Sequence, residues 1–223
     1  MQVFPTRHFF FAGHSAEIEA RTVSGGTSIA GDEDLIRADG GGRVVVEFSD
    51  PDLGPPAHAQ AWRSLDALLD GGAASIIVPL GDARNNGMGD VRLPPGGLPW
   101  WDEIAFAGVD TGAKVAAAGL RATTLTVTVT ALPGSIRPGQ WCSIDHTNRR
   151  YRAYRIAKVS DNGATVTIDI RPPLREAVAA GTPIDFVDPK CTMRLDGEMK
   201  SPTTLGYAES EGVRFVEQMG AIA

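Results

Sequence analysis

Histidine and carboxylate side chains are the groups best suited to metal binding or acid–base chemistry, and this chain holds few of them in a useful spacing. The four histidines are His8, His14, His58 and His146. No two of them have the spacing of metal ligands on one helix. The densest acidic run is Asp32, Glu33 and Asp34, which lacks the pattern and the glycine of a calcium-binding EF-hand. We interpret this run as a solvated loop and expect no metal site.

Nucleophilic and phosphate-binding motifs are also missing. No Gly-x-Ser-x-Gly sequence marks a serine nucleophile, and the glycines at 40–42 are not followed by the Lys and Ser or Thr of a phosphate loop. Cys142 and Cys191 are expected to be buried thiols, because a reducing cytoplasm disfavours the alternative of a disulfide between them. A pair of carboxylates for glycoside hydrolysis stays open as an alternative, although the sequence singles out no such pair.

Two clusters of aromatic or basic residues could bind a ligand. Trp100 and Trp101 fit a sugar-stacking platform, or else a hydrophobic anchor in the core or at an interface. Residues 149–155, RRYRAYR, interleave arginines with tyrosines that could stack on bases. Strand alternation divides these arginines between two faces, where they can equally pair with carboxylates of a neighbouring subunit. We therefore expect no nucleic-acid binding.

Composition limits the class of protein. Hydrophobic residues make up 43% of the 223 residues, enough for a core without a disulfide or metal. The net charge of −6 argues against coating of nucleic acid, which needs a basic surface. No apolar run approaches the roughly 20 residues of a membrane span, so no membrane insertion is expected. The N-terminal residues lack the features of a signal peptide, which predicts synthesis and folding in a cytoplasm.

The first half of the chain predicts a strand, a helix and a second strand. Residues 43–48 (RVVVEF) are rich in β-branched residues and predict a strand. Residues 57–70 follow two prolines and precede two glycines, as helices often do. Their apolar stripe comprises Ala61, Trp62, Leu65, Leu68 and Leu69, of which Trp62, Leu65 and Leu69 are expected to form the helix core. Residues 75–79 predict a short buried strand, and residues 85–99 a loop.

The second half predicts mostly strands. They are expected at 122–130, 139–144, 149–158, 164–170 and 182–187, with a hairpin turn at 161–163 and one or two helical turns at 174–180. A further strand at 190–195, a polar turn at 201–206 and a strand or short helix at 213–219 are expected to return to the N-terminal unit. The fold class is therefore mainly β with a short helix (α+β). We predict a discontinuous domain, 1–107 plus 189–223, carrying an inserted β-barrel or β-sandwich, 108–188.

Three stretches resemble the distal tail proteins of long-tailed (siphovirus-like) phages and gene transfer agent-like particles. The first is GDEDLIRADGGGRVVVEF followed by AWRSLDALLDGGAASIIVPLGD, which matches a glycine-led strand, a Trp-bearing helix and a short strand ending near a turn. The second, RYRAYRIAKV with ATVTIDIRPPLREAVAAGTPIDF, resembles a tail-associated β-module. The third, VDPKCTMRL, resembles the strand that re-enters the first domain after that module.

The resemblance implies a structural virion protein of the tail tip, without enzymatic activity or cofactor. In this family a β-rich belt domain forms a hexameric ring that joins the tail tube protein to the tail hub protein, and a peripheral domain is attached to the belt. Receptor-binding proteins or host glycans are further partners. The protein would be made in the bacterial host cytoplasm and end in the virion. The chain is shorter than many members of the family, and its peripheral module is inserted.

The aromatic N-terminus is the predicted contact between subunits. Residues 3–11 contain more aromatic surface than a free terminus needs, and pairing with a neighbour would protect a strand edge. The predicted interface residues are Val3, Phe4, Phe9, Phe10 and Phe11. The main alternative function is a carbohydrate-binding module that recognises host-surface glycans through Trp100 or Trp101. The third is a small hydrolase.

Overall fold

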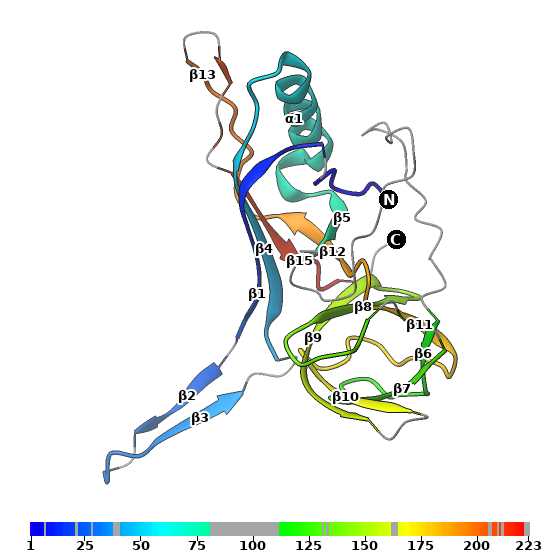
Figure 1. Ribbon diagram of the computed structural model, residues 1–223. Coiled ribbons are helices and arrows are strands. Elements are labelled where there is room, and N and C mark those ends of the chain that lie inside the picture. Colours follow the sequence, from blue (N-terminus) through cyan, green and yellow to red (C-terminus); the bar gives the residue numbers. More distant parts are fainter. Residues whose placement is uncertain are drawn as a thin grey trace.

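A computed structural model shows a mainly β protein built from an open sheet and a closed barrel (Figure 1). It describes residues 1–6, 8–20, 22–27, 29–37, 41–80, 112–130, 132, 134–161, 165–204, 207–208, 210 and 212–220. The predicted loop at 85–99, Trp100 and Trp101 lie outside these residues. So does Gly40 of the glycine turn.

The open sheet has five antiparallel strands in the order β1-β4-β15-β12-β5. They are β1 (Phe11–Glu19), β4 (Arg43–Pro51), β15 (Val213–Glu217), β12 (Lys190–Leu195) and β5 (Ser75–Pro79). Strands β12 and β15, the last two of this sheet in sequence, therefore lie in its middle, between strands from the first 79 residues. Residues 213–219, for which strand and helix were both open, form a strand at Val213–Glu217.

Helix α1 (Pro56–Leu69) packs its apolar stripe on the core. It follows Pro55, which is extended, and it ends where Asp70 adopts a positive φ of 46° before the short 3-10 turn η1 (Asp70–Gly72). Trp62, Leu65 and Leu69 are buried, as expected for the helix core. Leu68 was expected in the same stripe but is 51% exposed, so the buried face of the helix is narrower than predicted.

The N-terminal segment lies beside β5 of its own chain. Val3 forms a parallel bridge with Ile77, and the amide of Phe4 donates to the Ile77 carbonyl at 2.8 Å. Phe4 and Phe9 enter the core, where Phe9 meets Trp62 edge-to-face at 5.2 Å and Phe4 meets Phe215 at 4.8 Å. This segment covers part of the outer edge of β5.

The barrel is closed, with strand order β10-β7-β6-β11-β8-β9. Its strands are β6 (Ala113–Val115), β7 (Thr124–Val129), β8 (Trp141–His146), β9 (Arg150–Asp161), β10 (Val166–Arg171) and β11 (Thr182–Asp185). Closure excludes the sandwich alternative for these residues. Strand β8 begins two residues later than expected for its start at 139, because the Arg137 amide donates to the side chain of Gln140 at 2.7 Å and forms a turn there.

The helical turns expected at 174–180 are absent from the structure, which was a wrong prediction. Val178 instead forms a bridge with Ala118, in which each amide donates to the other residue's carbonyl. Pro172 and Pro173, just before this stretch, offer no amide hydrogen to a helix. Leu174 and Val178 in this stretch pack on the barrel core without forming a helix.

Two hairpins extend from the sheet toward opposite ends of the molecule (Figure 1). Strands β2 (Thr22–Thr27) and β3 (Glu33–Arg37) form the first, which we call the arm. Strands β13 (Thr203–Thr204) and β14 (Tyr207–Ala208) form the second, within and beyond the stretch expected to be a polar turn. The acidic run Asp32–Asp34 was predicted to be a loop, and this was only partly right. Strand β3 begins at Glu33, so only Asp32 lies outside the strand.

The barrel segment interrupts the sheet in sequence. Strands of the sheet come from residues 11–79 and 190–217, and strands of the barrel from residues 113–185. The exact division into 1–107 plus 189–223 and 108–188 stays a prediction, since its first boundary lies outside the described residues.

Candidate functional site

The predicted interface residues at the N-terminus are mostly core residues of this chain. Val3, Phe4 and Phe9 are 8%, 1% and 1% exposed, so a neighbouring subunit cannot reach them in this fold. Phe11 is half-buried and packs on Phe48 at 4.8 Å. Only Phe10, which is 71% exposed, keeps the surface that a contact between subunits requires. The aromatic excess in the sequence therefore reflects mainly the core of the open sheet.

The arm and the edge of the sheet offer a different surface for assembly. Among the described strands, β1 pairs with β4 alone, so it lies at the edge of the sheet, where Arg155 of the barrel donates to its Ala16 carbonyl at 2.5 Å. The arm continues from this edge and stands away from the rest of the described structure (Figure 1). Its tip carries Ile29, which is fully exposed, between Thr27 and Ala30. An isolated two-stranded hairpin is marginally stable in water, so such an arm is expected to pack against a partner.

The arginine-rich strand β9 binds the barrel to the sheet. Arg152 donates to the Thr192 carbonyl of β12 at 3.0 Å, and Arg155 donates to the Glu17 carboxylate of β1 at 3.0 Å. Arg149, just before the strand, donates to the Met219 carbonyl at 2.7 Å. The RRYRAYR run thus contacts the open sheet and the C-terminal segment of the same chain, whereas the sequence suggested carboxylates of a neighbouring subunit as possible partners.

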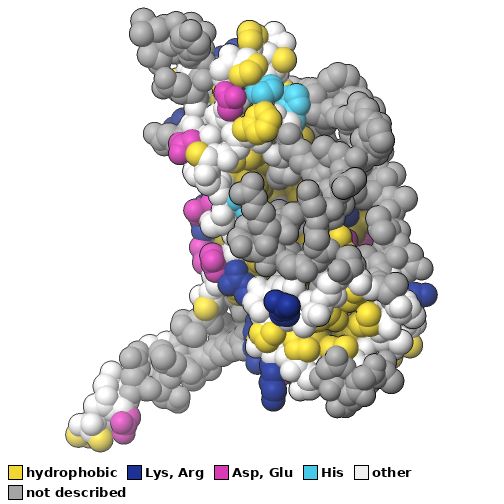
Figure 2. Space-filling view, in the orientation of Figure 1, with side chains coloured by type: hydrophobic (Ala, Val, Ile, Leu, Met, Phe, Trp, Pro, Cys, Tyr) yellow, Lys and Arg dark blue, Asp and Glu magenta, His cyan; other side chains and the backbone are white. Residues whose placement is uncertain are grey.

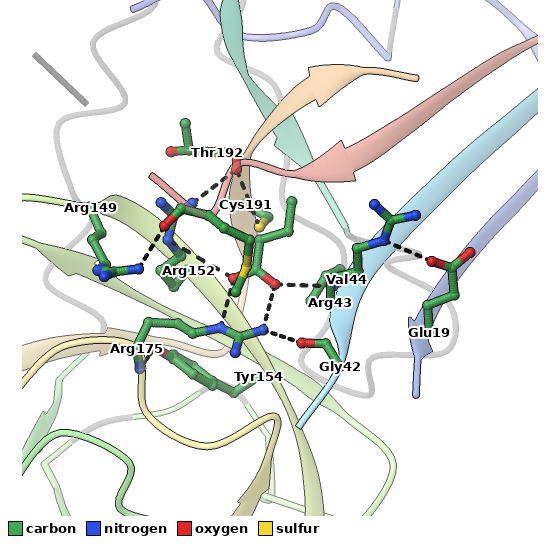
Figure 3. A network of polar contacts seen from close by, with 12 residues as sticks. Glu19, Gly42, Arg43, Val44, Arg149, Arg152, Tyr154, Arg175, Cys191 and Thr192 are labelled. Carbon is green, nitrogen blue, oxygen red and sulfur yellow. Dashed lines mark hydrogen bonds and ion pairs between the residues drawn. The ribbon is translucent and has the colours of Figure 1, made fainter. Parts of the chain in front are cut away.

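Figure 3 shows the polar contacts of this junction, with Arg152 and Arg175 of the barrel near Gly42 and Val44 of the sheet side. Glu217, at the end of β15, accepts two hydrogen bonds from the Arg175 guanidinium, at 2.9 and 2.7 Å. It also accepts the amide of Val44 at 3.1 Å, and its carboxylate lies 4.0 Å from Arg152 Nε. Arg175 further donates to the Gly42 carbonyl at 2.6 Å. The Glu217 and Arg152 side chains are fully buried, so this network joins β4, β15 and the barrel in the interior of the protein.

The sequence contains a signal for Glu217, although we did not predict a role for this residue. Strand alternation places residues 213, 215 and 217 on one face, and Val213 and Phe215 are apolar. A carboxylate at the third of these positions falls on a buried face and needs a cationic partner. Arg175 could not be paired with it from sequence, since the partner comes from a distant segment of the barrel.

A second buried polar group lies inside the barrel beside the junction. The Tyr154 hydroxyl accepts the Arg175 amide at 3.1 Å and lies 2.8 Å from His146 Nε2. Burial lowers the pKa of His146 to about 4 and raises the pKa of Tyr154. His146 is 3% exposed, because its ring lies beside the buried Tyr154 hydroxyl at the end of β8. It therefore stays neutral at ordinary pH.

Both cysteines are buried free thiols, as expected. Cys142 lies in the barrel core and Cys191 in the core of the open sheet. Burial raises the pKa of the Cys191 thiol to about 12 and raises that of Cys142 as well. Neither thiol is suited to act as a nucleophile, because the thiolate is the reactive form.

Two hollows occur near these features. The larger, about 1070 Å³, is an open groove between the end of β4 and the β12–β15 connection, with Asp50, Asp52 and Glu198 among its lining residues. The smaller, about 300 Å³, lies beside Glu217, between Arg43 and Arg194. Among the described residues, no three His, Cys, Asp or Glu side chains come together as a metal site. No helix in the described part of the chain is long and apolar enough to cross a membrane.

Comparison with known proteins adds no identification. No protein-family model matches the chain, and no curated protein matches it. A function is therefore proposed from the geometry of the molecule and from the sequence resemblance to distal tail proteins.

Proposed function

We propose that this protein is a structural subunit of a phage-type tail tip. Copies of the chain, six by analogy with the family it resembles, assemble into a ring that joins the tail tube to the hub and to receptor-binding parts. The protein acts as a scaffold in the virion and catalyses no reaction. It is made in the bacterial host cytoplasm, and neither membrane nor nucleic acid is among its partners.

The arm is the observation that carries this proposal. A closed ring of identical subunits needs a surface on each copy that fits a different surface on the next. The arm, and the side of β1 on which no described strand pairs, provide backbone and side-chain surface for such a contact, although Arg155 of the barrel bonds to Ala16 and Glu17 of β1. An exposed strand edge with an exposed Ile29 at the tip of its extension is a liability for a monomer. Contact with a neighbour removes that liability.

The junction between sheet and barrel also suits a scaffold. Four cationic side chains, Arg149, Arg152, Arg155 and Arg175, each bond to the sheet or to the segment after β15. A module held at several points keeps one orientation, which a peripheral domain needs if it is to occupy the same position in every copy of a ring.

The proposal is tested with two single variants of the full chain. Ile29→Asp places a charge at the arm tip, and Leu68→Asp places the same charge on the exposed face of α1. Negative-stain images of the parent, alone or with purified tail tube and hub proteins, should show rings. Ile29→Asp should abolish or reduce them while its circular dichroism stays unchanged, and Leu68→Asp should preserve them. Rings that are equally abundant with Ile29→Asp would contradict the role of the arm.

A further inference from the structure

His8 and His58 come together although the sequence places them on different elements. His8 belongs to the N-terminal segment, and His58 lies in the first turn of α1. Their ring centroids are 4.8 Å apart, with the ring planes tilted by 60°. Both side chains are partly exposed, and histidine side chains gather at the surface near the top of Figure 2. Two imidazoles at this separation are within reach of a single ion.

The tautomer of His58 suits a metal ligand. Its Nδ1 lies 2.9 Å from the carbonyl oxygen of Asp52. A carbonyl oxygen only accepts hydrogen bonds, so Nδ1 carries the proton and the lone pair lies on Nε2. Histidines that bind metals typically donate their other ring N–H to a carbonyl or carboxylate in this way, which fixes the ring.

Both histidines are held on fixed backbone. The amide of His8 donates to the Pro5 carbonyl at 2.9 Å, and the next residue, Phe9, is buried against Trp62 of α1. His58 is one helical turn from Trp62 itself, so the core fixes the two imidazoles relative to each other. Ligands that need no rearrangement lose little entropy when an ion binds.

Nearby charges act on a cation at the His8–His58 pair in opposite directions. The N-terminus of α1 carries a partial positive charge, which disfavours a cation. Asp52 is exposed next to the pair, and its carboxylate lowers the energy of a nearby cation. Imidazole nitrogens suit zinc, copper and nickel, whereas magnesium and calcium prefer oxygen ligands.

We propose that His8 and His58 together bind one divalent transition-metal ion, such as Ni²⁺ or Zn²⁺, with water in the remaining coordination positions. The ion joins the N-terminal segment to helix α1. It therefore stabilises the docking of that segment by mass action, since it binds the docked form alone. The site lies within a single subunit and is independent of ring formation.

The test uses untagged full-length protein freed of metal by a chelator, at pH 7.5. Ni²⁺ is titrated by calorimetry, with Mg²⁺ as the control ion. The variants are His8→Ala and His58→Ala, and the matched control is His14→Ala, which removes an exposed histidine on β1. We expect one Ni²⁺ per parent chain, affinity at least tenfold weaker in either pair variant, and unchanged affinity in His14→Ala.

A second readout separates binding at the pair from binding elsewhere. In imidazole NMR spectra of the four histidines, Zn²⁺ should shift the signals of His8 and His58 and leave those of His14 and His146 in place. Equal Ni²⁺ affinity of parent and His58→Ala, or Zn²⁺ shifts confined to other histidines, would overturn the proposal. If His8→Ala lowers the melting temperature without metal, its weaker Ni²⁺ binding could reflect unfolding of the N-terminal segment. The Ni²⁺ affinity of His58→Gln and the NMR shifts of the parent then test the proposal.

Discussion

Glu217 is the residue on which the attachment of the barrel depends most directly. It is fully buried and bonds to Arg175 through both carboxylate oxygens, while Arg152 lies 4.0 Å away. The cost of removing two arginines and a carboxylate from water offsets most of their attraction. The network therefore adds little net stability compared with apolar residues of the same volume, but the loss of one partner is severe.

We expect Glu217→Gln to lower the free energy of unfolding by about 3–5 kcal/mol, because two arginines then stay buried with no countercharge. The matched control is Glu198→Gln, which removes a carboxylate paired to Lys200 at 3.1 Å where both side chains are 76% exposed. Exposed pairs contribute little. Urea denaturation of both variants measures the difference. Equal losses in the two variants would show that Glu217 is not central to the junction.

His146 predicts a pH dependence of stability. Its folded pKa is about 4, below the ordinary value of 6.5, so the folded chain keeps it neutral. Between pH 6.5 and 4 the unfolded chain binds a proton that the folded chain does not. His146 therefore does not reduce the free energy of unfolding above pH 6.5. As the pH falls from 6.5 to 4, its protonation in the unfolded chain lowers that free energy by on the order of 3 kcal/mol.

His146→Gln should remove that dependence while keeping a hydrogen bond to Tyr154. The measurement is the free energy of unfolding of parent and variant at pH 7.5 and 4.5. We expect the parent to lose more stability than the variant between these values. Carboxylates titrate in both proteins, so only the difference between them reports on His146. Identical losses would mean that His146 is not buried in neutral form.

At the scale of elements, the strongest local patterns predicted best. The helix was marked by prolines at its start, glycines at its end and a stripe around Trp62, and it forms where expected. Most barrel strands were marked by alternation, and the return of β12 and β15 to the first sheet was also expected. Strand β1 was missed, because only Phe11, Ala16 and Ile18 pack on the core among its nine residues.

The candidate site was much less predictable than the fold. The aromatic residues near the N-terminus suggested an interface, but burial of Phe4 and Phe9 depends on long-range contacts with Phe215 and Trp62 that no local pattern shows. The acidic run within the arm, Asp32 to Asp34, was interpreted as a loop, and no strands were predicted on either side of it. The Glu217–Arg175 and His8–His58 pairs each join distant segments, and spacing along the sequence cannot show such pairs.

Substitution of Trp62 tests how helix α1 packs on the core. The Trp62 side chain is fully buried between the helix and the aromatic cluster of the N-terminal segment. We expect Trp62→Ala to lower the free energy of unfolding by about 3–5 kcal/mol, through lost burial and the cavity left behind. Leu68→Ala, at an exposed position of the same helix, should cost far less. Denaturant unfolding compares them, and similar costs would contradict the assigned face of the helix.

The arm predicts a difference in dynamics between free and assembled protein. Amides of β2 and β3 should exchange rapidly with solvent in the free chain, because a two-stranded hairpin has little to protect it. Amides of β4 and β15, which lie inside the sheet, should exchange slowly and serve as the internal control. Assembly should slow exchange in the arm and at the β1 edge, and leave β4 and β15 unchanged. Hydrogen-exchange mass spectrometry measures both states, and an arm that exchanges equally fast in rings would not be the contact between subunits.

At the scale of the whole molecule, the barrel and the sheet are connected by more than the chain itself. Arg155 stacks on Trp141 at 4.6 Å and bonds to β1, while Trp141 and Ala153 of the barrel belong to the core of the open sheet. A shared core and buried ion pairs favour movement as one body. Such a subunit keeps its sheet and barrel in a fixed relation, as the proposed ring would require.

Assembly of this chain into a closed ring is the property on which the proposed function depends. The most direct measurement is the mass of the purified untagged protein by light scattering across a range of concentrations, repeated with purified tail tube and hub proteins. We predict a species of about six chains, formed by the protein alone or in the presence of those partners. A protein that stays a monomer at every concentration and with every partner would contradict ring assembly, and binding of a glycan or turnover of a substrate by that monomer would favour the alternatives.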